Sequence, residues 1–326
     1  MSAPVLPSEA PFSPFADLAF GASPTRSATE LPEPRAALEI WWQAVALGGT
    51  GHYAAARTAL YRLRTATTDP VLLSLAASTE GSLRRQLGRH ARAARDDGYA
   101  AALVLPRLPA GAAGGHPAAG ATGGRGYHRA PDLLDAAADA LTGLAADALG
   151  TGRLALARRL LDRCAALLAG AGWVTGPAAN GAPAEQFGAD NVDRSRALVR
   201  LHWVRAETAL AGGQGQQALA DAEVARDLAE RGPSIRHQVK SRLLVAAATA
   251  VTGDTGRAAE LAALVDHQCR ESGLLPLRWA CAMLRTGLPA PAADPVADTR
   301  AAALADATAC RALITRRGGR FHDSGT

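Results

Sequence analysis

Residues 41–70 read WWQAVALGGTGHYAAARTALYRLRTATTDP. Apolar residues recur at helical spacing on both sides of a short turn at residues 51–53, and an Asp-Pro pair at residues 69–70 closes the second segment. Ala44 and Ala56 lie on either side of the turn, and small side chains at such positions let two helices approach closely. The stretch therefore predicts a helix, a tight turn, a second helix and a stop.

The same pattern recurs along most of the chain. Candidate turns are marked by five glycines, which are Gly51, Gly88, Gly152, Gly215 and Gly253. A small residue lies seven positions before each of them, at Ala44, Gly81, Ala145, Thr208 and Ala246. Another lies five positions after each of them, at Ala56, Ala93, Ala157, Ala220 and Ala258. A helix breaker follows each glycine by 18 to 20 positions, at Pro70, Pro106, Gly170, Pro233 and Gly273.

The first unit resembles the tetratricopeptide repeat in its small residue Ala44, its turn at Gly51, the aromatic Tyr53, the small Ala56 and the closing Asp-Pro pair. The resemblance extends over residues 35–287. It implies an all-α solenoid of about five stacked helix-turn-helix hairpins, followed by a C-terminal capping helix. The later units replace the turn aromatic with His90, Leu154, Gln217 and Thr255.

Composition shifts divide the chain further. Residues 1–34 are rich in Pro, Ser and Ala, and we expect a disordered N-terminal arm there. Residues 106–131 and 170–190 are too rich in Gly, Pro and Ala to form helices, which predicts flexible loops. Residues 288–326 read as a Pro-rich linker, a capping helix up to about Arg316 and a frayed polar tail.

Charge and hydropathy narrow the classes of partner. The formal net charge is +5, but 30 acidic residues are interspersed with the basic ones, and this pattern does not favour nucleic acid. No apolar run reaches the roughly 18 residues that a membrane span needs. The N-terminus lacks the charged and apolar regions of a secretory signal, so we expect a cytoplasmic protein.

Catalytic motifs do not appear in the sequence. Lys240 is the sole lysine and does not belong to a phosphate loop, and the chain has neither a nucleophile elbow nor a zinc-protease motif. The four cysteines, Cys164, Cys269, Cys281 and Cys310, show no metal-ligand spacing and read as reduced thiols in helices. Carboxylate pairs such as Asp96-Asp97 and Asp135/Asp139 read as solvated or offset by arginine. We therefore predict a protein that is not an enzyme and uses no cofactor.

The resemblance implies a groove lined by the first helix of each hairpin. The candidate residues for binding a peptide or protein there are Trp41, Arg85, His202, Arg205 and Lys240. His202, Arg205 and Lys240, with Arg236 at the edge, form a cationic cluster suited to an acidic partner. Two alternatives stay open: the cluster pairs with Glu207 and Asp221, or Trp41 packs in the core with Trp42.

Three functions fit these observations. The leading hypothesis is an adaptor that binds a protein segment in its groove, and the cationic cluster favours an acidic segment. The second is a module that senses a peptide or small ligand and acts on a separate transcription or signalling partner. The third is an all-helical enzyme in which the two Gly/Pro-rich loops form lids.

Overall fold

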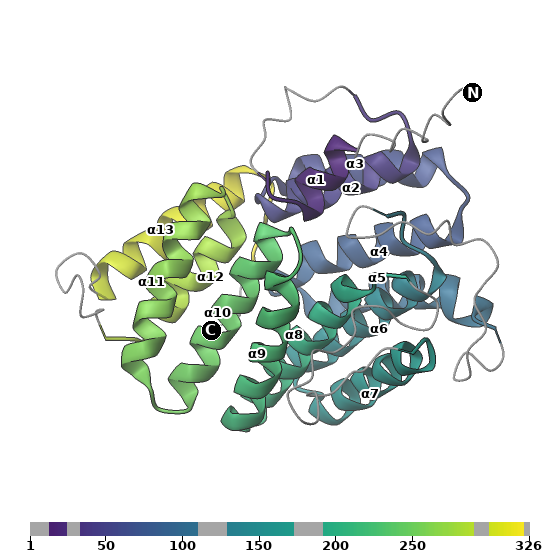
Figure 1. Cartoon of the computed structure of the whole chain (residues 1–326). Coiled ribbons are helices and arrows are strands. Elements are labelled where there is room, and N and C mark those ends of the chain that lie inside the picture. The colour runs from purple at the N-terminus through teal and green to yellow at the C-terminus, as the bar shows by residue number, and fades with distance from the viewer. Residues whose placement is uncertain (1–12, 25–32, 110–128, 173–191, 290–299, 323–326) are drawn as a thin grey trace, which may run out of the picture.

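The computed structural model describes residues 13–24, 33–109, 129–172, 192–289 and 300–322 (Figure 1). This part of the chain forms 13 α-helices and contains no strand, which confirms the all-α prediction. Consecutive helices pack in pairs, as in a solenoid. None of these helices is both long and apolar enough to cross a membrane.

Twelve of the helices form six successive hairpins. The first helices of the hairpins are α2 (Ala37–Gly49), α4 (Pro70–Arg85), α6 (Leu133–Gly150), α8 (Ser195–Ala211), α10 (Ile235–Val251) and α12 (Leu275–Arg285). The second helices are α3 (Tyr53–Ala66), α5 (His90–Val104), α7 (Leu154–Gly170), α9 (Gly215–Glu230), α11 (Thr255–Glu271) and α13 (Arg300–Arg316). A 3₁₀ turn (Leu105–Arg107) follows α5, and α1 (Pro14–Phe20) precedes the hairpins.

Four of the five predicted turn glycines have a positive φ, which glycine adopts without strain. Gly51, Gly88, Gly152 and Gly253 have φ between 75° and 101°, and each lies two residues before the second helix of its hairpin. In the fourth hairpin this position belongs to Gly213, with φ of 70°, whereas Gly215 is the first residue of α9. The predicted register of the fourth unit was therefore wrong by two residues.

The small residues after the turns are packed between helices. Ala56, Ala93, Ala157 and Ala258 are completely buried, as predicted. In the fourth hairpin, Ala218 is completely buried and the predicted Ala220 is exposed. The corrected glycine therefore restores the same spacing in all five hairpins.

The N-terminal segment departs from the prediction of a disordered arm over residues 1–34. Residues 14–20 form α1, which packs on α2 and also contacts α10. Phe15 and Phe20 are buried in the same apolar cluster as Trp41. The docking of these two rings supplies the apolar burial that the composition of the arm did not suggest. Residues 1–12 and 25–32 lie outside the described residues.

The C-terminal segment is not frayed over residues 317–322, contrary to the prediction. The Arg317 carbonyl accepts a hydrogen bond from the Ala54 amide at 2.9 Å, and the His322 amide donates to the Leu87 carbonyl at 2.7 Å. Arg57 also donates to the Gly318 carbonyl at 3.0 Å. The segment after α13 is thus bonded to the first two hairpins. The predicted capping helix is α13 itself, which covers α12 as the second helix of a sixth hairpin.

These contacts close the stack on itself. Leu275 and Ile314, from the last hairpin, belong to the same buried cluster as Tyr53 and Leu60 of the first. On the other side of α2, the guanidinium of Arg236 donates to the carbonyl of Val45 at 3.0 Å. Figure 1 shows the yellow C-terminal helices beside the purple N-terminal ones. The first helices of the hairpins consequently surround a common interior.

The two predicted flexible loops fall largely outside the described residues. Residues 110–128 and 173–191 are the parts not described, so the predictions for 106–131 and 170–190 stand as predictions. The same holds for residues 290–299, within the predicted linker.

Candidate ligand-binding pocket

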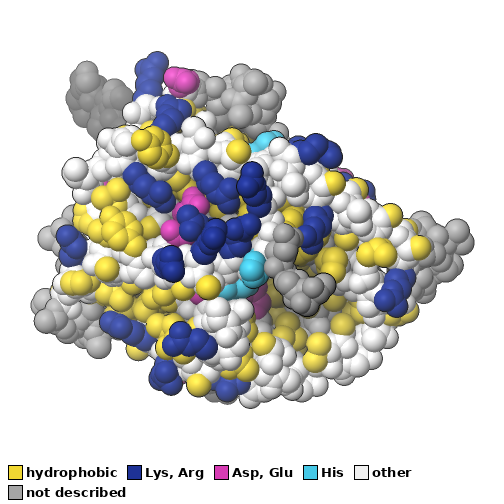
Figure 2. All heavy atoms as spheres, turned by 180° about the vertical axis from the view of Figure 1, so that it is seen from behind, with side chains coloured by type: hydrophobic (Ala, Val, Ile, Leu, Met, Phe, Trp, Pro, Cys, Tyr) yellow, Lys and Arg dark blue, Asp and Glu magenta, His cyan; other side chains and the backbone are white. Residues whose placement is uncertain are grey.

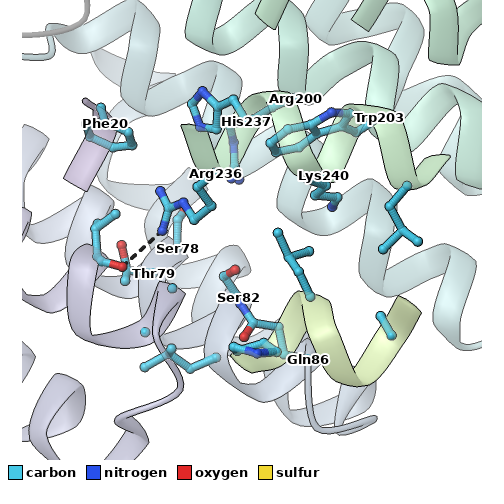
Figure 3. A pocket seen from close by; sticks show the side chains of 18 of the residues that line it. Phe20, Ser78, Thr79, Ser82, Gln86, Arg200, Trp203, Arg236, His237 and Lys240 are labelled. Carbon is cyan, nitrogen blue, oxygen red and sulfur yellow. Dashed lines mark hydrogen bonds between the residues drawn. The ribbon is translucent and has the colours of Figure 1, made fainter. Parts of the chain in front are cut away.

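A cavity of about 380 Å³ lies in this interior (Figure 3). Side chains from α2, α4, α6, α8, α10 and α12 line it, which are all first helices of hairpins. Phe20 of α1, Tyr53 at the start of α3 and Ile314 near the end of α13 complete the wall. The volume is within the range of sites that hold a small molecule or a short peptide.

Indole rings form much of the apolar wall. The ring nitrogen of Trp41 donates to Thr79 Oγ1 at 3.0 Å, and that of Trp203 donates to Ser241 Oγ at 2.8 Å. Trp41 is 1% and Trp203 6% exposed, so both rings pack at the back of the wall, and the half-buried side chains of Leu277 and Trp279 on α12 supply more of its accessible apolar surface. Leu243 adds aliphatic surface beside them. The pocket can therefore bury an apolar or aromatic body.

Asp139 is held between two arginines of α8. Its carboxylate lies 2.8 Å from Arg196 Nη1 and 2.8 Å from Arg200 Nε. Burial acts to raise the pKa of Asp139, but the two guanidinium groups outweigh it and lower the pKa below its usual value. The carboxylate is thus ionised at neutral pH and compensates one of the two arginine charges.

A second ion pair of the wall joins α8 and α10. Lys240 Nζ is 3.2 Å from Glu207 Oε1, and the same ammonium group lies 4.4 Å from the centroid of the Trp203 ring. Both side chains of the pair are about 30% exposed. This pair is neutral as a whole, but its lysine keeps donors directed toward a solvent-accessible space.

Arg236 has a different environment from the other cations of the pocket. Its guanidinium donates to the Val45 carbonyl and lies 5.6 Å from the centroid of the Phe20 ring. A side chain on Gly49 would collide with it, since a Cβ there would lie 2.7 Å from Nη1. The glycine at the end of α2 therefore makes room for this arginine.

Arg236 has no carboxylate of the described residues within ion-pairing distance. Burial, followed by the nearby charges of Arg200 and Arg196, lowers the pKa of Arg236 to about 10. The group is still a cation at neutral pH. Among the described residues, a carbonyl dipole and an aromatic face compensate its charge.

His237 follows Arg236 on α10 and is almost completely buried. Its ring lies 5.7 Å from Phe20 and 5.2 Å from Trp203, measured between centroids. Burial, followed by the charges of Arg236 and the other cations, holds the pKa of His237 well below its usual value. This imidazole is therefore neutral at pH 7 and adds no charge to the pocket.

Two of the five predicted groove residues line this pocket. Trp41 and Lys240 contribute to its wall. Arg85 does not, because its guanidinium pairs with Asp97 and lies 3.1 Å from Asp147 Oδ1 between α4, α5 and α6. It holds hairpins together instead of facing a ligand.

The predicted cluster of His202, Arg205 and Lys240 on one surface was wrong. His202 is buried with its Nδ1 2.8 Å from Asp221 Oδ1, the pairing considered as an alternative. Arg205 borders a separate hollow with Arg158 and residues of α9. Only Lys240 of the three reaches the central pocket.

The two-residue register error explains these misplacements. A shift by two residues toward the N-terminus converts His202 and Arg205 into Arg200 and Trp203, both of which line the pocket. The corrected turn glycine, Gly213, lies beside another glycine in the sequence. Both glycines have an alanine five residues later, Ala218 and Ala220, so only the positive φ of Gly213 identifies the turn. Arg196 and Asp139 were missed because solvent exposure was expected for helical charges.

The carboxylates considered at the sequence level are paired with arginine and not solvated. Asp97, Asp135 and Asp139 are all buried, and each lies in an ion pair with at least one arginine. The four cysteines are buried, and none of them forms a disulfide with another. No group of three or more His, Cys, Asp or Glu side chains in the described part of the chain is arranged to hold a metal ion.

The chain matches no protein-family model and no curated protein.

Proposed function

We propose that this chain is a non-catalytic binding protein that takes a short peptide or a small molecule into its central pocket. The observation that carries the proposal is the pocket itself, enclosed by the first helices of the hairpins and large enough for such a ligand. An extended protein segment would need an open groove, whereas contacts between the first and last hairpins close this one. The pocket therefore favours the ligand-binding alternative over the long-segment adaptor.

The arrangement also indicates what occupancy would do. A ligand in the pocket would contact α2 and α4 on one side and α8, α10 and α12 on the other. Such contacts would strengthen the closure of the stack, because they join parts of the chain that are distant in sequence. A ligand that changes closure would let the protein act as the sensing module considered above, with the outer helices available to a separate partner.

Binding without turnover is supported by the state of the acidic groups. Asp139 is fixed by two arginines, and Glu207 pairs with Lys240. A general base or acid needs a pKa close to neutral pH and a free path to the substrate. The low pKa of Asp139 suits a structural or recognition role instead.

The test is a thermal-shift screen of short peptides and small metabolites, with a variant that fills the pocket. Ala280 lines the pocket, so A280F should abolish the stabilisation by any hit, while A91F, on the exposed surface of α5, should leave it unchanged. A ligand at 100 times its Kd stabilises the folded state by about 2.7 kcal/mol. A screen in which every hit survives A280F would contradict the proposal.

A second function, docking of an acidic protein, is favoured by the outer surface. Arg62 and Arg64 of α3 and Arg92 and Arg95 of α5 are exposed. Basic side chains also gather around a few acidic ones on the face of the molecule that Figure 2 shows. A partner that docks on the arginines of α5 should be lost when Arg92 and Arg95 are both replaced by Glu and should tolerate A280F. The two sites can therefore be separated experimentally.

A further inference from the structure

The charges on the pocket wall do not cancel. The described residues that line the pocket include four cations, Arg196, Arg200, Arg236 and Lys240, but two carboxylates, Asp139 and Glu207. The carboxylates are engaged in the ion pairs described above, and His237 is neutral. Among these described residues the cations outnumber the carboxylates by two, and Arg236 is the cation that has no carboxylate of this set beside it. A cation in a partly enclosed space is costly unless an anion compensates it.

The excess charge is concentrated where α8 and α10 face the pocket. Arg196 and Arg200 are four residues apart on α8, and Arg236 and Lys240 are four residues apart on α10, so each pair lies on one face of its helix. Arg196 and Arg236 each lie 5.6 Å from the centroid of the Phe20 ring, so one guanidinium of each pair lies beside the same ring. Figure 3 places Arg236 and Lys240 on the same side of the cavity, with Trp203 near the lysine.

Arg236 has donors left for a ligand. A guanidinium carries five N–H groups, and the structure uses one of its nitrogens for the Val45 carbonyl. The planar fork matches two oxygens of a carboxylate or phosphate. The guanidinium of Arg236 lies over the aromatic ring of Phe20 and in the space that Gly49 leaves open. Neither neighbour carries a charge that would neutralise it.

We propose that the pocket binds an organic oxyanion, with its carboxylate or phosphate on Arg236 and its apolar body against the apolar side chains that line the pocket. This inference rests on the proposed ligand-binding function and names the chemical class of the ligand. Arg200 and Lys240 supply further positive charge beside the anion. The acidic groups that already occupy the wall, Asp139 and Glu207, restrict the anion to the region around Arg236.

The first experiment uses a matched pair of fluorescent probes. Anilinonaphthalene sulfonate carries an aromatic body and one anionic group, and phenylnaphthylamine is the same body without the charge. The wild-type protein should bind the anionic probe about 10-fold more tightly than the neutral one, as expected for a charge-assisted hydrogen bond. Arg236→Met should remove this preference and leave the affinity for the neutral probe unchanged.

Two further variants control the result. Arg242 lies on the same helix, outside the pocket and paired with Glu230, so Arg242→Met should bind both probes as the wild type does. Arg236→Lys keeps the charge and should retain part of the preference, which covers the case in which Arg236→Met does not fold. Competition of phenylbutyrate, phenethyl phosphate and phenylbutyramide against the anionic probe then distinguishes a carboxylate from a phosphate ligand.

The outcomes separate the inference from the proposed function. Equal affinity for both probes, or displacement by phenylbutyramide as effective as by the two anions, would overturn the oxyanion and leave ligand binding intact. If neither probe binds the wild-type protein, or if A280F does not weaken their binding, the pocket is not a ligand site and both proposals fail. Loss of the anionic probe in Arg236→Met alone would support both.

Discussion

At the residue scale, one alanine per hairpin determines how closely its helices approach. Ala218 occupies this position on α9 and is completely buried, whereas Ala220 is exposed only two residues later. The sequence pattern alone could not separate them, since both are alanines at plausible spacing from a glycine. The positive φ of Gly213 separates them, because it fixes where the turn ends.

The packing of this position can be tested with a matched pair of variants. Ala218→Leu adds volume where no space exists and should lower the free energy of unfolding by about 1–3 kcal/mol. Ala220→Leu adds the same atoms to an exposed position and should change it by less than about 0.5 kcal/mol. Urea denaturation measures both, and equal effects of the two substitutions would show that the corrected register is wrong.

Buried carboxylates were the residues hardest to anticipate. Asp97 and Asp147 converge on the single guanidinium of Arg85 from helices α5 and α6. A charged residue on a helix is usually solvated, so no sequence pattern pairs residues that lie so far apart along the chain. Their partners follow from the stacking of hairpins, which brings α4, α5 and α6 together.

Asp97 and Asp147, the two carboxylates beside Arg85, predict that the stability of the protein depends on pH. Burial, with Asp97 beside it, outweighs Arg85 and raises the pKa of Asp147 from 3.8 to about 7. Between these values the folded protein holds a proton that the unfolded chain has released. The stability that this group contributes is therefore complete below about pH 4 and is lost as the pH rises to about 7, at no more than about 1.4 kcal/mol per pH unit.

Asp147→Asn removes this titration. The stability of the variant relative to the wild type should increase between about pH 4 and pH 7 and stay constant above pH 7. Thermal unfolding across this range, in a series of buffers at constant ionic strength, measures the difference. Parallel profiles for the two proteins would mean that Asp147 is ionised throughout.

At the element scale, the hairpins could be predicted and the ends of the chain could not. Each hairpin is specified locally by a turn glycine, small packing residues and a breaker, so its helices follow from nearby sequence. Helix α1 depends on docking instead. It has seven residues, too few for a stable isolated helix, and its two phenylalanines acquire their burial from α2 and α10.

The docking of α1 can be tested at Phe15, which is buried in the cluster around Trp41. Phe15→Ala should detach α1 and increase amide hydrogen exchange over residues 14–20, because this helix has no stability of its own. Tyr61→Ala, at an aromatic residue of α3 that is 69% exposed, is the control and should leave exchange in α1 unchanged. Protection of α1 that persists in Phe15→Ala would contradict the docking.

At the scale of the whole molecule, the closure of the stack determines the pocket. Each hairpin contacts its neighbours through local packing, but the meeting of the last hairpin with the first depends on the accumulated rotation between hairpins. A sequence pattern specifies the hairpins and contains no direct record of that rotation. The inner helices and the pocket residues Trp41 and Lys240 were therefore predictable, whereas the closed shape and the role of Arg236 in it were not.

Gly318 offers a direct test of closure. It has φ of 86°, and a Cβ placed there would lie 2.7 Å from Ala54 Cβ and 3.0 Å from the Ala54 amide nitrogen. Gly152 has a similar φ of 75°, but a Cβ there would meet nothing within 4 Å. Gly318→Ala and Gly152→Ala therefore share the cost of a left-handed alanine, about 1–2 kcal/mol, and differ in whether they disturb the contact between the last and first hairpins.

Gly318→Ala should destabilise the protein by about 1–3 kcal/mol more than Gly152→Ala, because its Cβ collides with backbone that cannot move freely. It should also increase exchange of the Ala54 amide, which donates to the Arg317 carbonyl at 2.9 Å. If the pocket depends on closure, the anionic probe should bind Gly318→Ala more weakly and Gly152→Ala as it binds the wild type. Equal stability losses with an unchanged Ala54 amide would show that the two ends of the stack are independent in solution.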